Sequence, residues 1–191
     1  MVEPSVDLIV PASALKATNG TAAAEACAVP GSGPAYPDSL LLRIYEETRT
    51  IAMVGASPNW VRPSFFVMRY LQRKGYRVIP VNPRALDAPI LGERVYPDLE
   101  SIPVPVDVVD VFRRPEETPA IARSAASIGA RVLWLQLGIR NDEAATIAGV
   151  AGLTVIQDRC MKIEYGRLGG ELAWSGINTR IISSRRRRLL G

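Results

Sequence analysis

The sequence contains no histidine, and this absence removes several classes of chemistry. Histidine is the commonest general acid or base in enzymes, a member of Ser-His-Asp triads and a frequent metal ligand. Chemistry that passes through a phosphohistidine is excluded as well. We therefore assign no catalytic or metal-binding residue from the sequence. The sequence leaves open whether the chain is an enzyme, and it favours a protein without catalytic activity.

Cysteines and long apolar segments are also scarce. The two cysteines, Cys27 and Cys160, cannot make a disulfide framework, which fits a reducing compartment. We expect Cys160 to be a buried structural cysteine, and the alternative is a thiol that reacts with the thiol of a ligand. No apolar run approaches the roughly 20 residues of a membrane helix, and the N-terminus does not resemble a signal peptide. A soluble cytoplasmic protein without a membrane partner is the expectation.

The positive charge is concentrated near one end of the chain. The net charge of +4 comes from 23 basic and 19 acidic residues, and the run Arg185, Arg186, Arg187 and Arg188 accounts for the whole excess. The rest of the chain is therefore neutral overall, so we do not expect it to bind nucleic acid. The run favours a solvated terminus, with contact to RNA or anionic lipid as the alternative.

Composition divides the chain into three parts. Residues 1–37 are rich in Ala, Pro, Gly, Ser and Thr, which predicts a flexible N-terminal extension. Residues 38–170 carry the patterns of a folded domain, and residues 171–191 form a C-terminal extension with the arginine run. Hydrophobic residues make up 48% of the chain, which is enough for one real core.

Short apolar runs alternate with helical patterns along the folded part. Strands are predicted at 50–54, 76–81, 94–96, 106–112, 131–135 and 154–157, and helices at 39–47, 64–74, 115–129 and 141–151. Nearly continuous apolar strands separated by helices indicate a parallel sheet that is covered on both faces. We therefore predict an α/β fold, a single Rossmann-like doubly wound parallel sheet with the strand order 3-2-1-4-5-6.

The turn after the first predicted strand is the most informative segment, since ligands of such sheets bind at the carboxyl ends of the strands. Gly55 permits a sharp turn and the close approach of a ligand, Ala56 follows it, and Ser57 offers a hydroxyl. Arg62 can pair with phosphate oxygens, and Ser64 can cap the next helix and leave amides aimed at an anion. The loop favours phosphate binding over an ordinary turn, although it lacks the spacing of dinucleotide-binding and Walker A loops.

The turn after the second predicted strand reads Asn82-Pro83-Arg84. Enzymes that bind NAD usually place an acidic residue here to hold the ribose, and this turn has none. Arg84 instead favours an additional phosphate, such as that of NADP or the 3′-phosphate of coenzyme A.

Two further strand ends contribute candidate residues. Phe112 could stack on adenine and Arg113 could reach a phosphate, or Phe112 could belong to the core and Arg113 to the solvated surface. Gln136 is a polar residue at the end of an apolar run, so we expect it to face the ligand, whereas Trp134 is expected in the core. Gly138 would let a ligand chain pass closely.

From residue 50 to residue 168 these segments resemble the small bacterial CoA-binding domain proteins, and they are similar to the CoA-binding domain of the succinyl-CoA synthetase α subunit. The resemblance implies a site for coenzyme A or acyl-CoA over the first loop, Asn82-Pro83, Phe112-Arg113 and Gln136. The synthetase has a second domain with a phosphorylated histidine, and since this chain has no histidine, the ligase reaction does not carry over. The motifs that carry the resemblance are Gly55-Ala56-Ser57, Arg62-Pro63-Ser64, 75–83, 108–113, Trp134-Leu135-Gln136 with Gly138-Ile139, and Asp158-Arg159-Cys160.

Three hypotheses follow. The first is a protein that binds coenzyme A or acyl-CoA without catalysis. The second is an NAD(P)-dependent oxidoreductase-like protein, for which Tyr165 and Lys162 are the candidate proton donors. The third is a regulatory module that contacts a protein partner through its extensions. A homo-oligomer is compatible with each.

Overall fold

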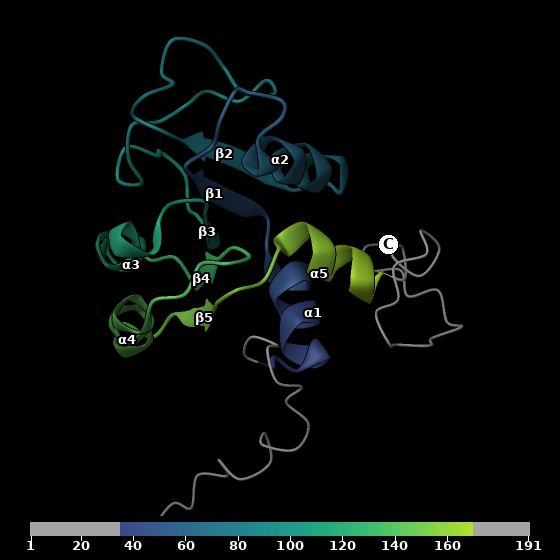
Figure 1. Ribbon diagram of the computed structural model, residues 1–191, viewed down its shortest axis with the longest axis vertical. Coiled ribbons are helices and arrows are strands. Elements are labelled where there is room, and N and C mark those ends of the chain that lie inside the picture. The colour runs from purple at the N-terminus through teal and green to yellow at the C-terminus, as the bar shows by residue number, and fades with distance from the viewer. Residues whose placement is uncertain (1–34, 170–191) are drawn as a thin grey trace, which may run out of the picture. The chain divides into compact units, whose positions relative to one another are not determined.

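The computed structural model describes residues 35–169, in which strands and helices alternate (Figure 1). The predictions for 1–34 and 170–191, which include Cys27 and the arginine run, lie outside the described residues. The strands are β1 (Thr50–Val54), β2 (Arg77–Val81), β3 (Val108–Val111), β4 (Val132–Leu135) and β5 (Thr154–Ile156). The helices are α1 (Asp38–Glu47), α2 (Pro63–Arg73), the 3-10 helix η1 (Pro115–Glu117), α3 (Thr118–Ser127), α4 (Asp142–Val150) and α5 (Met161–Leu168). Within residues 35–169, no helix is long and apolar enough to span a membrane.

The strands form one all-parallel sheet in the order β2-β1-β3-β4-β5. The predicted α/β, Rossmann-like fold is confirmed, but the strand predicted at 94–96 is wrong, so the predicted order loses its outermost member. Tyr96 makes only an isolated parallel bridge to the end of β2. It donates its N–H to the Pro80 carbonyl at 3.0 Å and accepts the Asn82 N–H at 2.9 Å. Pairing extends in neither direction from this bridge. Pro80, which faces this segment from β2, has no N–H to donate to it, and the Asn82 carbonyl accepts the Ala85 N–H at 3.2 Å in the turn after β2.

Helix α2 begins one residue earlier than predicted. Its first residue is Pro63, a position that suits proline because the first N–H of a helix has no partner within the helix. Arg62 is therefore the N-cap residue, and the prediction that Ser64 caps the helix is wrong. Ser64 lies in the first turn with 4% of its surface exposed. The positive end of the α2 dipole still adjoins the loop after β1.

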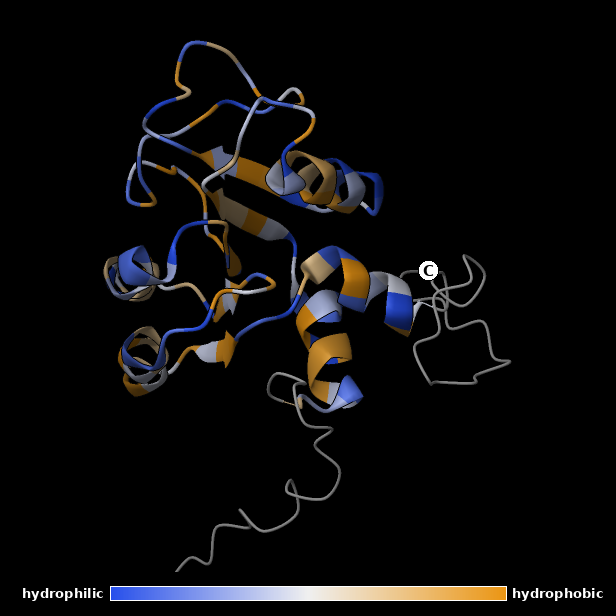
Figure 2. Cartoon of the chain, viewed as in Figure 1, coloured by the Kyte–Doolittle hydropathy of each residue, from blue (hydrophilic) through white to orange (hydrophobic). Residues whose placement is uncertain are grey.

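Helices cover both faces of the sheet, and each face has its own core. Val108 of β3 and Trp134 of β4 pack with residues of α1, α2 and α5, whereas Val109 and Leu133 pack with residues of α3 and α4. Figure 1 shows these two groups of helices on opposite sides of the strands, and Figure 2 shows that the strands are largely hydrophobic. The alternation follows from the pleat, which turns successive side chains to opposite faces. Trp134 is fully buried, as predicted.

Tyr36, which falls in the predicted N-terminal extension, packs against the core under α1, α2 and α5. Its hydroxyl oxygen accepts the Gln157 N–H at 2.7 Å, just after β5 ends. The chain therefore already contacts the carboxyl edge of the sheet before α1 begins.

Candidate functional site

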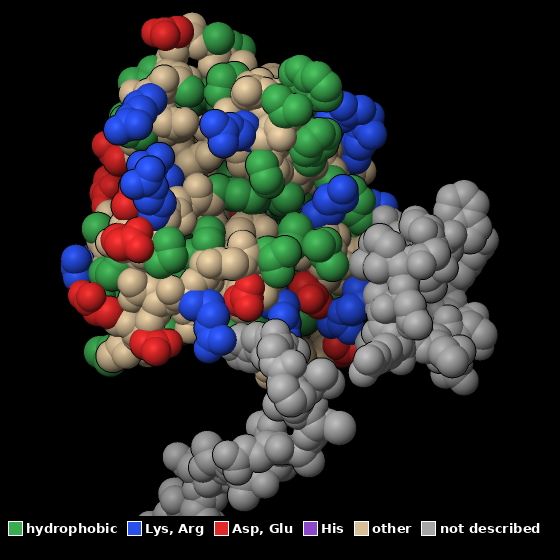
Figure 3. Space-filling model, in the orientation of Figure 1, with side chains coloured by type: hydrophobic (Ala, Val, Ile, Leu, Met, Phe, Trp, Pro, Cys, Tyr) green, Lys and Arg blue, Asp and Glu red, His purple; other side chains and the backbone are tan. Residues whose placement is uncertain are grey.

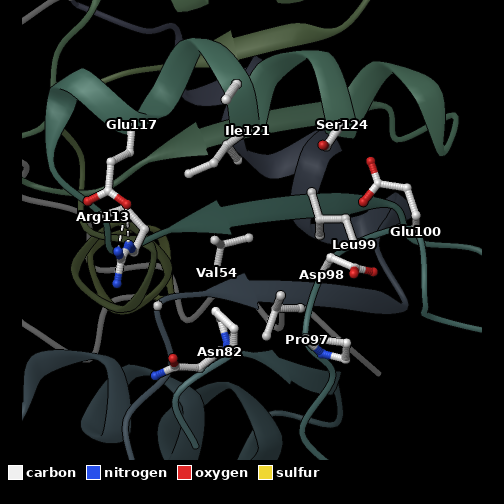
Figure 4. A pocket seen from close by; sticks show the side chains of 14 residues that line it. Val54, Asn82, Pro97, Asp98, Leu99, Glu100, Arg113, Glu117, Ile121 and Ser124 are labelled. Carbon is white, nitrogen blue, oxygen red and sulfur yellow. Dashed lines mark hydrogen bonds and ion pairs between the residues drawn. The ribbon is translucent and has the colours of Figure 1, made fainter.

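A pocket of about 230 Å³ lies at the carboxyl edge of the sheet, between the ends of β1, β2 and β3 and helix α3 (Figure 4). Val54, Leu99 and Ile121 give it apolar walls. Figure 4 shows that these side chains come from the sheet, from the segment after Tyr96 and from α3. Of the residues selected from the sequence, those that line the pocket are Gly55, Asn82, Pro83 and Arg113.

Gly55 is the residue at which the loops after β1 and β3 touch. Its φ is +87°, and a Cβ placed on it would lie 2.7 Å from the Phe112 carbonyl oxygen and 2.9 Å from Cδ of Arg113. The Gly55 N–H donates to the Val81 carbonyl at 2.9 Å, which continues the pairing of β1 with β2 by one residue. Glycine is required here for its left-handed backbone and for the space that the neighbouring loop occupies.

Asn82 holds the turns after β1 and β2 together. Its Nδ2 donates to the Ala56 carbonyl at 2.7 Å, and its Oδ1 accepts the Arg84 N–H at 2.9 Å. Ala56 is buried, whereas Pro83 and Arg84 are exposed. Asn82 therefore shapes this edge of the site, and Arg84 is exposed directly after Pro83, which lines the pocket.

Replacing Asn82 by aspartate is expected to destabilise the fold by about 1–3 kcal/mol, because a carboxylate cannot donate to the Ala56 carbonyl. The bond from the Arg84 N–H can remain, since it needs only an oxygen acceptor. Urea unfolding at neutral pH measures the change. Asn59→Asp is the matched control, because Asn59 is exposed and accepts the Val61 N–H through Oδ1. Equal losses in the two variants would contradict the role given to Asn82.

The loop after β1 is shaped by turns of its own. The Ser57 hydroxyl oxygen accepts the Asn59 N–H at 3.2 Å, and Asn59 Oδ1 accepts the Val61 N–H at 3.0 Å. Trp60 is 67% exposed. Arg62 is exposed at the start of α2, so its positive charge and the positive end of the helix dipole act on the same region. Both favour an anion beside this loop.

Arg113 already has an anionic partner. Its Nε and Nη2 donate to Oε2 of Glu117 at 2.8 and 2.6 Å, as the dashed lines of Figure 4 show. The two side chains are 32% and 39% exposed, so a phosphate at this position would share Arg113 with Glu117. Phe112 is half-buried and packs against the core under α1, α2 and α5, the position that the core alternative predicts.

Gln136 does not line the pocket but contacts a carboxyl in the core. Its Nε2 donates to Oδ1 of Asp110 at 2.7 Å, and the two residues are 3% and 0% exposed. Burial raises the pKa of Asp110 to about 7, against the opposing effect of the Gln136 hydrogen bond. No role for Asp110 was predicted from the sequence. The signal that marks it is a lone carboxylate in an otherwise apolar strand.

The loops after β4 and β5 are joined to each other. Gly138, with a φ of +80°, donates its N–H to Oδ1 of Asp158 at 2.7 Å. The Asn141 N–H donates to Oε1 of Gln157 at 2.8 Å. Gly138 is exposed, and among the described residues nothing lies within 4 Å of a Cβ placed on it. The side chains of Asp158 and Gln157 therefore hold the loop after β4 in place. Gly138 itself is exposed and lies outside the pocket.

The residues considered for chemistry lie outside the pocket. Cys160 is half-buried at the N-cap of α5, and burial raises the pKa of its thiol, so little thiolate forms at neutral pH. Tyr165 is 5% exposed and packs edge-on against Tyr45, with ring centres 5.2 Å apart. Lys162 is exposed, and its Nζ lies 5.7 Å from the centre of the Tyr70 ring. The structure therefore brings none of these three candidates to the pocket.

The features above define a class of protein: a Rossmann-like domain with a turn-rich loop after its first strand and a pocket at the carboxyl edge, as is typical of nucleotide-binding domains. Residues 49–166 match the family described as CoA binding domain, and the chain belongs to that family. The uncharacterized protein YneT of Bacillus subtilis is 38% identical over 122 residues, which cover 64% of this chain and 89% of YneT.

Solved structures show the same fold. A hypothetical protein from Pyrococcus horikoshii is 39% identical, with a TM-score of 0.67, and the match covers 70% of this chain and 92% of that one. A protein from Thermus thermophilus is 37% identical, with a TM-score of 0.67 and coverages of 70% and 99%. A dinucleotide-forming acetyl-coenzyme A synthetase from Ca. Korarchaeum cryptofilum is 22% identical, with a TM-score of 0.54, and the match covers 62% of this chain and 28% of the synthetase. This last likeness shows the fold alone.

Proposed function

We propose that this protein binds coenzyme A or an acyl-CoA at the carboxyl edge of its sheet and acts without catalysis, as a binding or regulatory protein. The observation that carries the proposal is the convergence of Gly55, Asn82 and Arg113, from separate strand ends, on one pocket. Membership of the CoA binding domain family supports coenzyme A as the nucleotide.

The size of the pocket indicates which part of the ligand it holds. Sites for whole drug-sized ligands measure about 300–1,000 Å³, and this pocket measures about 230 Å³. Its walls of Val54, Leu99 and Ile121 suit a flat base such as adenine. In this arrangement the phosphates and the pantetheine arm extend from the pocket across the strand-end loops.

Three arginines supply positive charge along these loops. Arg62 stands at the N-cap of α2, Arg84 follows the Asn82 turn, and Arg113 lines the pocket beside Glu117. Guanidinium groups suit phosphate because two parallel N–H groups can meet two oxygens. We assign the 3′-phosphate of coenzyme A to Arg84, since that residue is exposed and directly follows Pro83, which lines the pocket.

Two of the three acidic residues that line the pocket, Asp98 and Glu117, are held in close contacts, and the third, Glu100, accepts the Ser127 hydroxyl at 3.4 Å; these contacts support binding without catalysis. Oδ1 of Asp98 accepts the N–H and the hydroxyl of Ser101 at 2.8 and 2.5 Å. Glu117 is paired with Arg113 at 2.6 Å. A general base must reach the proton that it removes, and a carboxylate held in such contacts is poorly placed for that task.

Titration calorimetry with coenzyme A, dephospho-CoA and NADP tests the proposal. We expect coenzyme A to bind and Arg84→Ala to weaken it about tenfold, while dephospho-CoA binds the variant and the wild type alike. Arg123→Ala is the matched control, because Arg123 lies on α3, is exposed and does not line the pocket. No heat and no thermal shift at millimolar coenzyme A, or a clear preference for NADP, would overturn the proposal.

A further inference from the structure

The carboxyl of Asp110 is buried in the central strand of the sheet. Asp110 is 0% exposed, and its register neighbours are Met53 of β1 and Trp134 of β4. Its Oδ1 accepts the bond from Gln136 at 2.7 Å, and its Oδ2 has no hydrogen-bond partner among residues 35–169. Because burial raises its pKa to about 7, this carboxyl gains or loses a proton near neutral pH.

The pKa of Asp110 is set by burial and by the Gln136 hydrogen bond, with no charged partner beside them. At the start of α5, Lys162 lies over the Tyr70 ring and Arg159 lies beside Glu164. From α1, Tyr45 is neutral, since burial raises the pKa of its hydroxyl well above the usual value. From α5, burial likewise keeps the Cys160 thiol protonated, and Glu164 is paired with Arg167 at 2.7 Å. Helix α2 and strand β1 contribute apolar side chains to this core. An ionised Asp110 would therefore be an unbalanced negative charge.

This charge would lie one residue before the end of β3, on the sheet face covered by α1, α2 and α5, whereas the pocket walls Val54 and Ile121 belong to the core on the other face. Its link to the ligand edge runs through the loops that follow the strands. Phe112 follows Asp110 by two residues, and its carbonyl lies against Gly55 in the loop after β1. On the other side, Gln136 connects Asp110 to the loop after β4. Like charges repel more strongly in a protein interior than in water. An ionised Asp110 therefore opposes an anion at this edge, and a protonated Asp110 does not.

We propose that Asp110 is a proton-binding site coupled to the ligand site, so that binding of a phosphate-bearing ligand draws a proton from solvent onto Oδ2. This inference rests on the proposed function. The step joins one solvent proton to the carboxylate and changes no other bond. Because coupling between two sites is reciprocal, ligand affinity falls as the pH rises and Asp110 loses its proton.

Proton uptake on binding tests this coupling. Coenzyme A is titrated into the full chain at pH 7 in two buffers that differ in ionisation enthalpy. We expect the wild type to take up more protons per bound coenzyme A than Asp110→Asn, whose amide keeps the acceptor for Gln136 and cannot ionise. The difference between the two proteins is the readout, because the phosphate monoester of coenzyme A itself titrates near pH 6. Between about pH 6 and about pH 8, the wild-type affinity should fall about five- to tenfold more than that of the variant.

A second measurement needs only the wild type. Carbon-13 NMR of the side-chain carboxyls follows the titration of Asp110, whose midpoint should rise when coenzyme A is bound. A midpoint that does not move, or equal proton uptake in the wild type and in Asp110→Asn, overturns the inference and leaves coenzyme A binding intact. Absence of coenzyme A binding at every pH overturns the proposed function, and the coupling with it.

Discussion

Replacing Gly55 by alanine is expected to abolish measurable coenzyme A binding and to destabilise the fold by about 2–4 kcal/mol. Two costs add. A φ of +87° is unfavourable for a residue with a Cβ, and that Cβ would lie 2.7 Å from the Phe112 carbonyl oxygen. A backbone atom cannot rotate away as a side chain can, so the loop after β3 must move, and Arg113 of the pocket moves with it. Urea unfolding measures the stability, and titration calorimetry measures the binding.

Gly75→Ala is the matched control for this substitution. Gly75 has a φ of +92°, but among the described residues nothing lies within 4 Å of a Cβ placed on it. Gly75→Ala should therefore lose only the stability that the backbone strain costs, about 1–2 kcal/mol. Gly75 follows the C-terminal end of α2, whereas Gly55 precedes the helix. If Gly55→Ala were as stable as Gly75→Ala and still bound coenzyme A, the close approach of the two loops would have no functional consequence.

Replacing Asp110 by asparagine is expected to stabilise the fold above neutral pH. The pKa of Asp110 is raised from its ordinary value of 3.8 to about 7, so the folded state retains a proton that the unfolded state releases. Wild-type stability, relative to a variant that cannot ionise, is then highest below about pH 4 and falls as the pH rises to about 7. At about 1.4 kcal/mol per pH unit, the variant gains about 4 kcal/mol at pH 8. Urea unfolding curves across this range measure the gain.

Asp107→Asn is the control, because its effect on stability at neutral pH is expected to have the opposite sign. Partial burial alone would raise the pKa of Asp107, but the carboxylate accepts the N–H groups of Thr50 and Arg49 and pairs with Arg131, and these contacts lower the pKa. Its contribution to stability is present at neutral pH and is lost as the pH falls through the lowered pKa. A difference between Asp110→Asn and the wild type that does not change with pH would contradict a buried carboxyl that titrates on folding.

The strands of the sheet could be predicted because buried parallel strands are nearly continuous apolar runs, which can be recognised without knowing their partners. The segment 94–96 has strand-forming side chains in Val95 and Tyr96, yet only Tyr96 bridges to β2. A strand also needs a neighbour that exchanges hydrogen bonds with it. Before the bridge, Pro80 of β2 has no N–H to donate, and after it the Asn82 carbonyl is used by the turn after β2. At the start of α2, Ser64 is a good cap by residue type, but Pro63 takes the first helical position.

For the candidate site, the absence of histidine chemistry follows from the residues alone, and the apolar runs predict the strand ends to within a residue. Gly55, Asn82 and Gln136 follow apolar runs, and parallel strands bring such ends to one edge. The contacts of these side chains, by contrast, depend on how the chain folds. Asn82 donates to Ala56 and Gln136 donates to Asp110, each across 26 residues, and no local pattern reveals a partner so distant. The protonation of Asp110 was likewise decided by packing, because it depends on the helices that cover the strand and exclude water from the carboxyl.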